Sequence, residues 1–63
     1  MPVVIVKLIG KLTKEQKKKI ATDITASLNN HAGKPPEATH VIFEEHEAES
    51  WAHAGILFSE MKK

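Results

Sequence analysis

The chain has 63 residues and no cysteine, and its nine basic and eight acidic residues leave a formal charge of +1. A chain this short buries only about 60% of the surface of its unfolded form, so a single core stabilises it weakly. The lack of cysteine excludes disulfides and thiolate metal sites, which leaves oligomerisation as the expected source of stability. All nine basic residues are lysine, and the near-neutral charge argues against nucleic acid or an anionic membrane as a partner.

Residues 3–9, VVIVKLI, form the first predicted element. A nearly continuous apolar run rich in β-branched side chains predicts a strand that is buried on both faces, as in a parallel sheet. Its most apolar part, residues 3–6, is far too short to span a bilayer, and the start lacks the pattern of a secretory signal. We therefore expect a single cytoplasmic domain over residues 1–63.

A long helix is predicted over residues 14–31, because Thr13 and Gln16 have the spacing of a capping box. Gly33 suits a left-handed cap after the helix, and Pro35 and Pro36 prevent its continuation. We expect one buried stripe that contains Ile20, Ala21, Ile24, Ser27 and Leu28. The lysines are expected to form a solvated face, at positions 14, 17, 18 and 19.

The second predicted strand covers residues 39–45, THVIFEE, and its apolar centre again suggests burial on both faces. The tail contains Trp51 and Gly55, which favour a turn or short hairpin before a brief strand over residues 56–58. Strand, helix and strand form a right-handed β-α-β unit in a small α+β fold. Because one helix covers only one face of a two-stranded sheet, we expect the other face to pack on another subunit.

Pro2 is the first candidate catalytic residue. Once the initiator methionine is removed, Pro2 carries a secondary amine at the chain terminus. An α-amine has an ordinary pKa of about 7.7–8.0, well below that of a lysine side chain, and burial lowers it further. Such an amine can serve as a general base near neutral pH.

The whole chain resembles the 4-oxalocrotonate tautomerase family. The resemblance rests on the start Pro-Val-Val-Ile-Val, the Gly-Lys turn at 10–11 and the helix opening at 13–17. It continues through Gly33 and the following prolines, the strand at 40–45, and Trp51 with Ala54-Gly55. It implies a β-α-β subunit in a homohexamer, a trimer of dimers, that needs no metal or organic cofactor. It also implies that Pro2 is a general base that moves a proton between carbons of a 2-oxo acid enol or dienol.

Two arginines that bind substrate oxygens in that family have no counterpart in this chain. In an ungapped alignment from Pro2, their positions fall on Leu12 and His40. Lys11 and His40 are therefore the expected substrate-binding residues, although a lysine lacks the two-pronged guanidinium that grips a carboxylate. Trp51 falls on the aromatic position that lines the family's pocket. The expected substrate is a monocarboxylate or a smaller, less charged enol.

Two other functions stay open. A related proline-dependent hydratase, dehalogenase or decarboxylase would need an acid to activate water, and the available acids include Glu44, Glu45 and Glu49. A non-catalytic oligomer of the same fold is the other alternative, favoured by the missing arginines. His46 and His53 lie among glutamates, but their spacing fits no known metal site, so we expect none.

Overall fold

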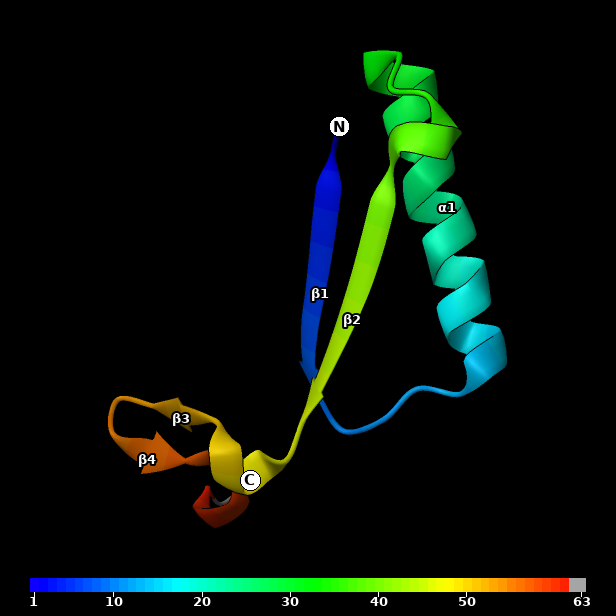
Figure 1. Ribbon diagram of the computed structural model, residues 1–63. Helices are drawn as coiled ribbons and strands as arrows, with labels where there is room; N and C mark the ends of the chain where they lie inside the picture. The colour runs from blue at the N-terminus through cyan, green and yellow to red at the C-terminus, as the bar shows by residue number, and fades with distance from the viewer. Residues whose placement is uncertain (62–63) are drawn as a thin grey trace.

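The structure is a computed structural model that describes residues 1–61. Figure 1 shows a strand, a long helix, a second strand beside the first, and a small C-terminal hairpin. The strands and the helix are β1 (Val3–Ile9), α1 (Lys14–Ala32), β2 (His40–His46), β3 (Ala52–His53) and β4 (Ile56–Leu57). Single 3₁₀ turns cover Pro36–Ala38, Ala48–Ser50 and Phe58–Glu60. The predicted α+β fold with a β-α-β unit and a C-terminal hairpin is confirmed.

β1 and β2 pair in parallel, from Val3 opposite His40 to Ile9 opposite His46. The predicted bounds of β1 are confirmed, whereas β2 lies one residue later than predicted. It starts later because the Thr39 N–H donates to the carbonyl of Pro36 (3.1 Å) and so belongs to the preceding turn. It ends later because the Gly10 N–H donates to the His46 carbonyl (3.0 Å) and extends the pairing.

α1 begins where the sequence predicts. The Gln16 N–H donates to Thr13 Oγ1 (3.1 Å) and the Thr13 N–H donates to Gln16 Oε1 (2.9 Å), which completes the capping box. The helix ends at Ala32, one residue later than predicted. Gly33 follows with a φ of 66° and donates its N–H to the Asn29 carbonyl (3.1 Å), so it is the expected left-handed cap.

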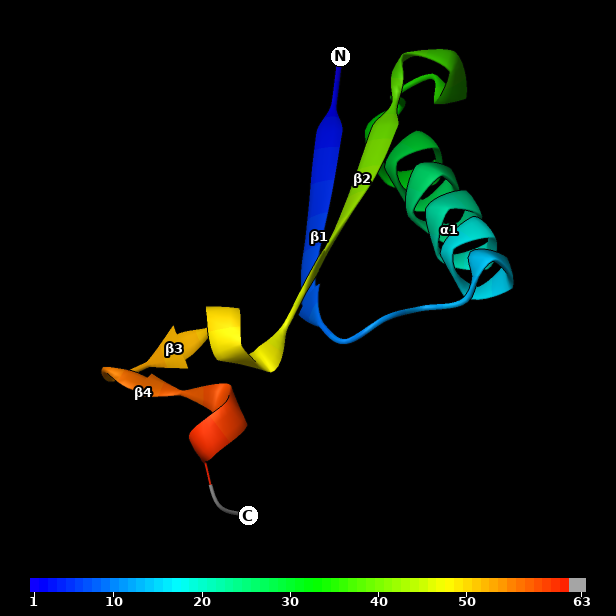
Figure 2. The same cartoon turned by 60° about the horizontal axis from the view of Figure 1, so that its bottom comes forward.

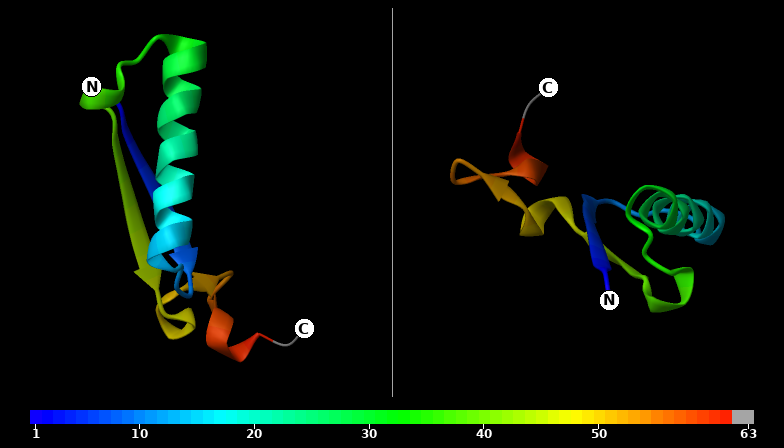
Figure 3. Two further views of the ribbon diagram at one scale, coloured as in Figure 1. Left: turned by 90° about the vertical axis from the view of Figure 1, so that its right-hand side faces the viewer. Right: turned by 90° about the horizontal axis from the view of Figure 1, so that it is seen from above.

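One side of α1 covers one face of the sheet, as Figure 3 shows in two orientations. Ser27 is exposed, so its predicted place in the buried stripe is wrong, and Thr25 on the opposite margin of the stripe is half-buried instead. Lys17 also departs from the predicted solvated face. Its Nζ lies 3.1 Å from Glu45 Oε1 of β2, so the side chain reaches between helix and sheet. The half-buried side chains of α1 are those of Lys17, Ile20, Ala21, Ile24, Thr25 and Leu28.

The other face of the sheet is uncovered, so burial of the strands on both faces is wrong for a single subunit. Val3, Ile5 and Ile42 are 54%, 50% and 45% exposed. No side chain among residues 1–61 is fully buried. The radius of gyration is 15.0 Å, whereas a compact domain of this length would have about 11 Å. A single subunit therefore lacks a closed core among these residues and leaves its apolar sheet face uncovered. Within residues 1–61, no helix has the length and apolarity needed to cross a membrane.

The predicted C-terminal hairpin is present and extends away from the end of the sheet (Figure 2). Ala54 and Gly55 form its two-residue turn, with φ values of 54° and 81°. The strand predicted over residues 56–58 ends at Leu57, because Phe58 begins a 3₁₀ turn. The Phe58 N–H donates to the Trp51 carbonyl (2.8 Å) and holds the base of the hairpin together.

Ala54 gives a first prediction on stability. Alanine pays roughly 1–2 kcal/mol for a left-handed conformation, whereas asparagine tolerates it better and Asn-Gly is a preferred two-residue hairpin turn. Ala54→Asn is therefore expected to raise the thermal midpoint by a few degrees. Differential scanning calorimetry measures the shift, and Ala52→Asn on the adjacent strand is the control. An unchanged or lower midpoint for Ala54→Asn would contradict the strain assigned to this turn.

Candidate active site

Two of the four predicted site residues meet at the start of the sheet. Pro2 is half-buried, and its carbonyl accepts the backbone N–H of His40 (3.0 Å). Val3 pairs with His40 in the ladder, so the start of β1 and the start of β2 are neighbours. Met1 precedes this junction and is 87% exposed in a single subunit.

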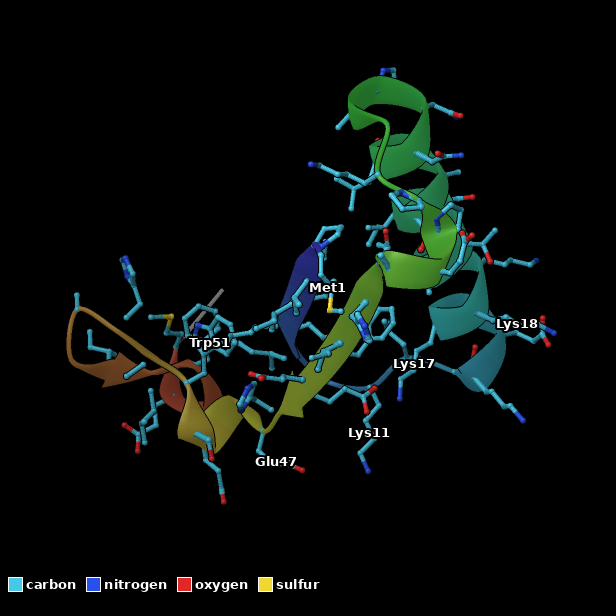
Figure 4. The ribbon with its side chains drawn as sticks, turned by 45° about the horizontal axis from the view of Figure 1, so that its top comes forward. Met1, Lys11, Lys17, Lys18, Glu47 and Trp51 are labelled. Atoms are coloured by element: carbon cyan, nitrogen blue, oxygen red, sulfur yellow. The ribbon has the colours of Figure 1, made fainter. Side chains whose placement is uncertain are left out.

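The other two predicted site residues lie near the opposite end of the sheet. Lys11 follows β1, a strand of seven residues that spans about 20 Å, and Trp51 follows β2. Figure 4 shows the Lys11 and Trp51 side chains on opposite sides of the end of β2. Within one subunit, Pro2 and His40 are therefore together, while Lys11 and Trp51 are separate from them and from each other.

Trp51 belongs to a small aromatic cluster that connects the hairpin to β2. Its ring meets Phe58 edge-to-face, with 6.2 Å between centroids and 62° between planes. It meets His46 in the same manner, at 5.8 Å and 67°. The two contacts hold a half-buried indole beside the last residue of β2.

Sequence reasoning considered His46 only as a metal ligand and did not place it on the same face of the sheet as His40. The signal was present in the strand, because side chains of a β-strand alternate between faces and His46 follows His40 by an even number of residues. His46 Nε2 lies 3.7 Å from Glu44 Oε1, and the same oxygen lies 3.8 Å from Lys7 Nζ. The uncovered sheet face therefore ends in a group of charged and polar side chains next to Trp51.

Glu45 holds the turn that carries Lys11. Its Oε2 accepts the Leu12 N–H (2.7 Å) and its Oε1 accepts a hydrogen bond from Lys17 Nζ (3.1 Å). The Leu12 hydrogen bond is the largest cause that lowers the pKa of the Glu45 carboxyl, followed by the hydrogen bond from Lys17 and opposed by partial desolvation. The carboxylate thus ties the β1–α1 connection and the helix to β2.

This lowered pKa makes the subunit sensitive to acid. A carboxyl whose pKa is lower in the folded state contributes stability above its unfolded pKa and loses that contribution as the pH falls through its folded pKa. Glu45→Gln is therefore expected to unfold at a lower denaturant concentration than the parent at pH 7. The denaturant concentrations at which the two proteins unfold should converge at a pH well below the ordinary pKa of glutamate.

Urea unfolding at the two pH values measures this effect. The matched control is Glu47→Gln, because Glu47 is an exposed neighbour whose side chain Figure 4 shows beyond the end of β2. If Glu45→Gln lowers the urea midpoint by the same amount at both pH values, the charge of Glu45 contributes nothing to stability.

The broad hollow on the subunit surface does not coincide with the predicted site. It lies along α1 and contains neither Pro2 nor Trp51. Its lining residues are Ala21, Thr22, Thr25, Ala26, Asn29, Asn30 and Pro36. The four predicted site residues thus share no single cavity within residues 1–61 of one subunit.

Curated relatives resemble this chain over nearly its full length. The "Probable tautomerase LL0574" of Lactococcus lactis subsp. lactis is 51% identical over 65 residues, covering 100% of this chain and 97% of the relative. The "Probable tautomerase RSp1151" of Ralstonia nicotianae is 42% identical over 60 residues, covering 95% and 92% of the two chains.

Solved structures share the fold as well. YwhB, described as a homologue of 4-oxalocrotonate tautomerase, superposes with a TM-score of 0.87 at 31% identity, covering 97% of this chain and all of YwhB. A heterohexamer 4-oxalocrotonate tautomerase from Chloroflexus aurantiacus has the same fold, with a TM-score of 0.83 at 21% identity, covering 98% of this chain and 100% of that chain. The family model described as "Tautomerase enzyme" matches residues 2–61. The chain therefore belongs to the tautomerase family.

Proposed function

We propose that this protein is an isomerase that catalyses 1,3- or 1,5-keto–enol proton transfer on the enol or dienol of a 2-oxo acid. The observation that carries the proposal is the position of Pro2 in a tautomerase-family chain. It is half-buried at the start of the sheet, and Met1, which precedes it, is exposed. Removal of Met1 converts the nitrogen of Pro2 from an amide, which has no basic lone pair, into a secondary amine.

Pro2 is the general base in this mechanism. The neutral amine takes the proton of the enol 2-hydroxyl and delivers a proton to a carbon of the same conjugated system, at C3 in a 1,3-transfer or at C5 in a 1,5-transfer. An α-amine titrates near neutral pH, so it can take up and release a proton there efficiently. The partial burial of Pro2 opposes charge on the amine and so favours its neutral form.

The proposed active site is shared between subunits of a homohexamer, a trimer of dimers. Pro2 and His40 lie about 20 Å along the sheet from Lys11 and Trp51, so they can meet only if a second copy brings its opposite end close. The uncovered apolar face of the sheet supports such an assembly. So does the fold shared with a relative that is described as a heterohexamer.

The substrate is proposed to carry one carboxylate and little other charge. Lys11 supplies a point charge and His40 a hydrogen-bond donor, whereas the chain contains no arginine to bind a carboxylate through two parallel bonds. Trp51 supplies an apolar wall. Together these groups suit a planar, monoanionic enol better than a dianion.

Ketonisation of phenylenolpyruvate tests this function. The decay of the enol is followed by ultraviolet absorbance, with protein that mass spectrometry confirms to begin at Pro2. Protein-dependent decay is the expected result. If a chain with a free Pro2 amine leaves the spontaneous rate unchanged, the tautomerase proposal is contradicted, and a related lyase or a non-catalytic oligomer becomes the better explanation.

A further inference from the structure

His46 lies beside the aromatic wall of the proposed site. It is the last residue of β2, its side chain is 38% exposed, and its ring centroid is 5.8 Å from that of Trp51. Ligand sites are mostly apolar surfaces with a few polar groups that orient the ligand. The His46 ring is a polar group in edge-to-face contact with the indole.

The Nε2 atom of His46 is available to donate a hydrogen bond. Its distance of 3.7 Å from Glu44 Oε1 exceeds that of a hydrogen bond, and no hydrogen bond from the ring occurs within residues 1–61. A neutral imidazole carries one N–H, on either nitrogen. The negative charge of Glu44 on the Nε2 side favours the tautomer that has its proton there.

We propose that His46 donates a hydrogen bond from Nε2 to the 2-oxygen of the substrate, with the carbon chain of the substrate against Trp51. This assignment rests on the proposed tautomerase function. When the enol 2-hydroxyl loses its proton, negative charge develops on the 2-oxygen, and a fixed N–H donor stabilises that charge. Glu44 disfavours the full and permanent charge of a carboxylate at this position, so the 2-oxygen, which carries negative charge only during the proton transfer, is the better partner for His46. Lys7 Nζ lies 3.8 Å from the same Glu44 oxygen, so its positive charge offsets part of the negative charge of Glu44 beside the substrate.

A comparison of two ligands isolates this contact. Phenylpyruvate contains the 2-oxygen, and 3-phenylpropanoate has the same ring and carboxylate without it. Isothermal titration calorimetry measures both affinities for the parent and for His46→Phe, which keeps an aromatic ring against Trp51 but removes the N–H. We expect His46→Phe to weaken phenylpyruvate binding about tenfold, or about 1.4 kcal/mol, and to leave 3-phenylpropanoate binding unchanged. His46→Gln, which restores a donor, should recover part of the lost affinity.

The control is His53→Phe, a histidine that is exposed in the hairpin, and it should bind both ligands as the parent does. If His46→Phe binds phenylpyruvate as tightly as the parent, or loses both ligands equally, the assignment of His46 is overturned. A parent protein that binds neither ligand also overturns it. Because binding is measured without turnover, the result is independent of Pro2. If Pro2→Ala keeps full activity while the His46 difference persists, only the assignment of the base has failed.

Discussion

Pro2→Ala is expected to lower kcat for ketonisation of phenylenolpyruvate by about a hundredfold or more, because a positioned general base contributes roughly 10²–10⁴. Alanine keeps an α-amine but loses the pyrrolidine ring, which fixes the backbone and the direction of the nitrogen lone pair. The Pro2 carbonyl accepts its hydrogen bond from His40 through the backbone, so the start of the sheet is retained in the variant. Light scattering should therefore give the same mass for Pro2→Ala as for the parent.

A chain that keeps Met1 is the matched control for this experiment. Its Pro2 ring is intact, but its nitrogen is an amide and cannot accept a proton. It should have as little activity as Pro2→Ala or less, whereas Pro36→Ala, which changes a proline in the turn before β2 and leaves the Pro2 amine in place, should retain activity. Full activity in the chain that keeps Met1 would show that the amine of Pro2 is not the base.

The elements of the fold were predictable because each has a local signal. The apolar run 3–9 became β1, and the capping box at Thr13 fixed the start of α1. The errors arose where tertiary contacts decide. Thr39 is drawn into the Pro36–Ala38 turn, and Lys17 turns inward because Glu45 of β2 lies within 3.1 Å. A helical periodicity cannot indicate which carboxylate a lysine will meet across the sheet.

The candidate site was only partly predictable for a related reason. The alignment with the family identified Pro2, Lys11, His40 and Trp51, but it gave no distances between them. Within one subunit, only Pro2 and His40 lie together. The contact of His46 with Trp51 depends on how the turns after β2 fold back, and the sequence pattern has no marker for that path. The separation of the predicted site residues and the His46–Trp51 contact have one physical cause, because long-range contacts rather than local propensity determine where these side chains lie.

Ile5→Lys combined with Ile42→Lys is expected to separate the assembly into smaller species. The two isoleucines are neighbours in the β1–β2 ladder, and they are 50% and 45% exposed at the centre of the uncovered sheet face. Full burial of an isoleucine side chain stabilises by roughly 1.5–3 kcal/mol, so covering the exposed half of each contributes about 1 kcal/mol per residue in every subunit. Burial of a lysine charge in the same place would be unfavourable by more than that.

Size-exclusion chromatography with light scattering measures the result, with a mass near six subunits expected for the parent. Lys18→Glu is the control, because Figure 4 shows Lys18 on the side of α1 away from the sheet, and its change of charge should leave the mass unaltered. If the double variant keeps the parent's mass, the uncovered face is not the interface between subunits.

Because a single subunit has no fully buried side chain among residues 1–61, we also expect the separated species to unfold at a lower temperature than the parent. Loss of assembly and loss of stability should therefore occur together, and activity should disappear with them, since Pro2 and Trp51 can meet only between subunits.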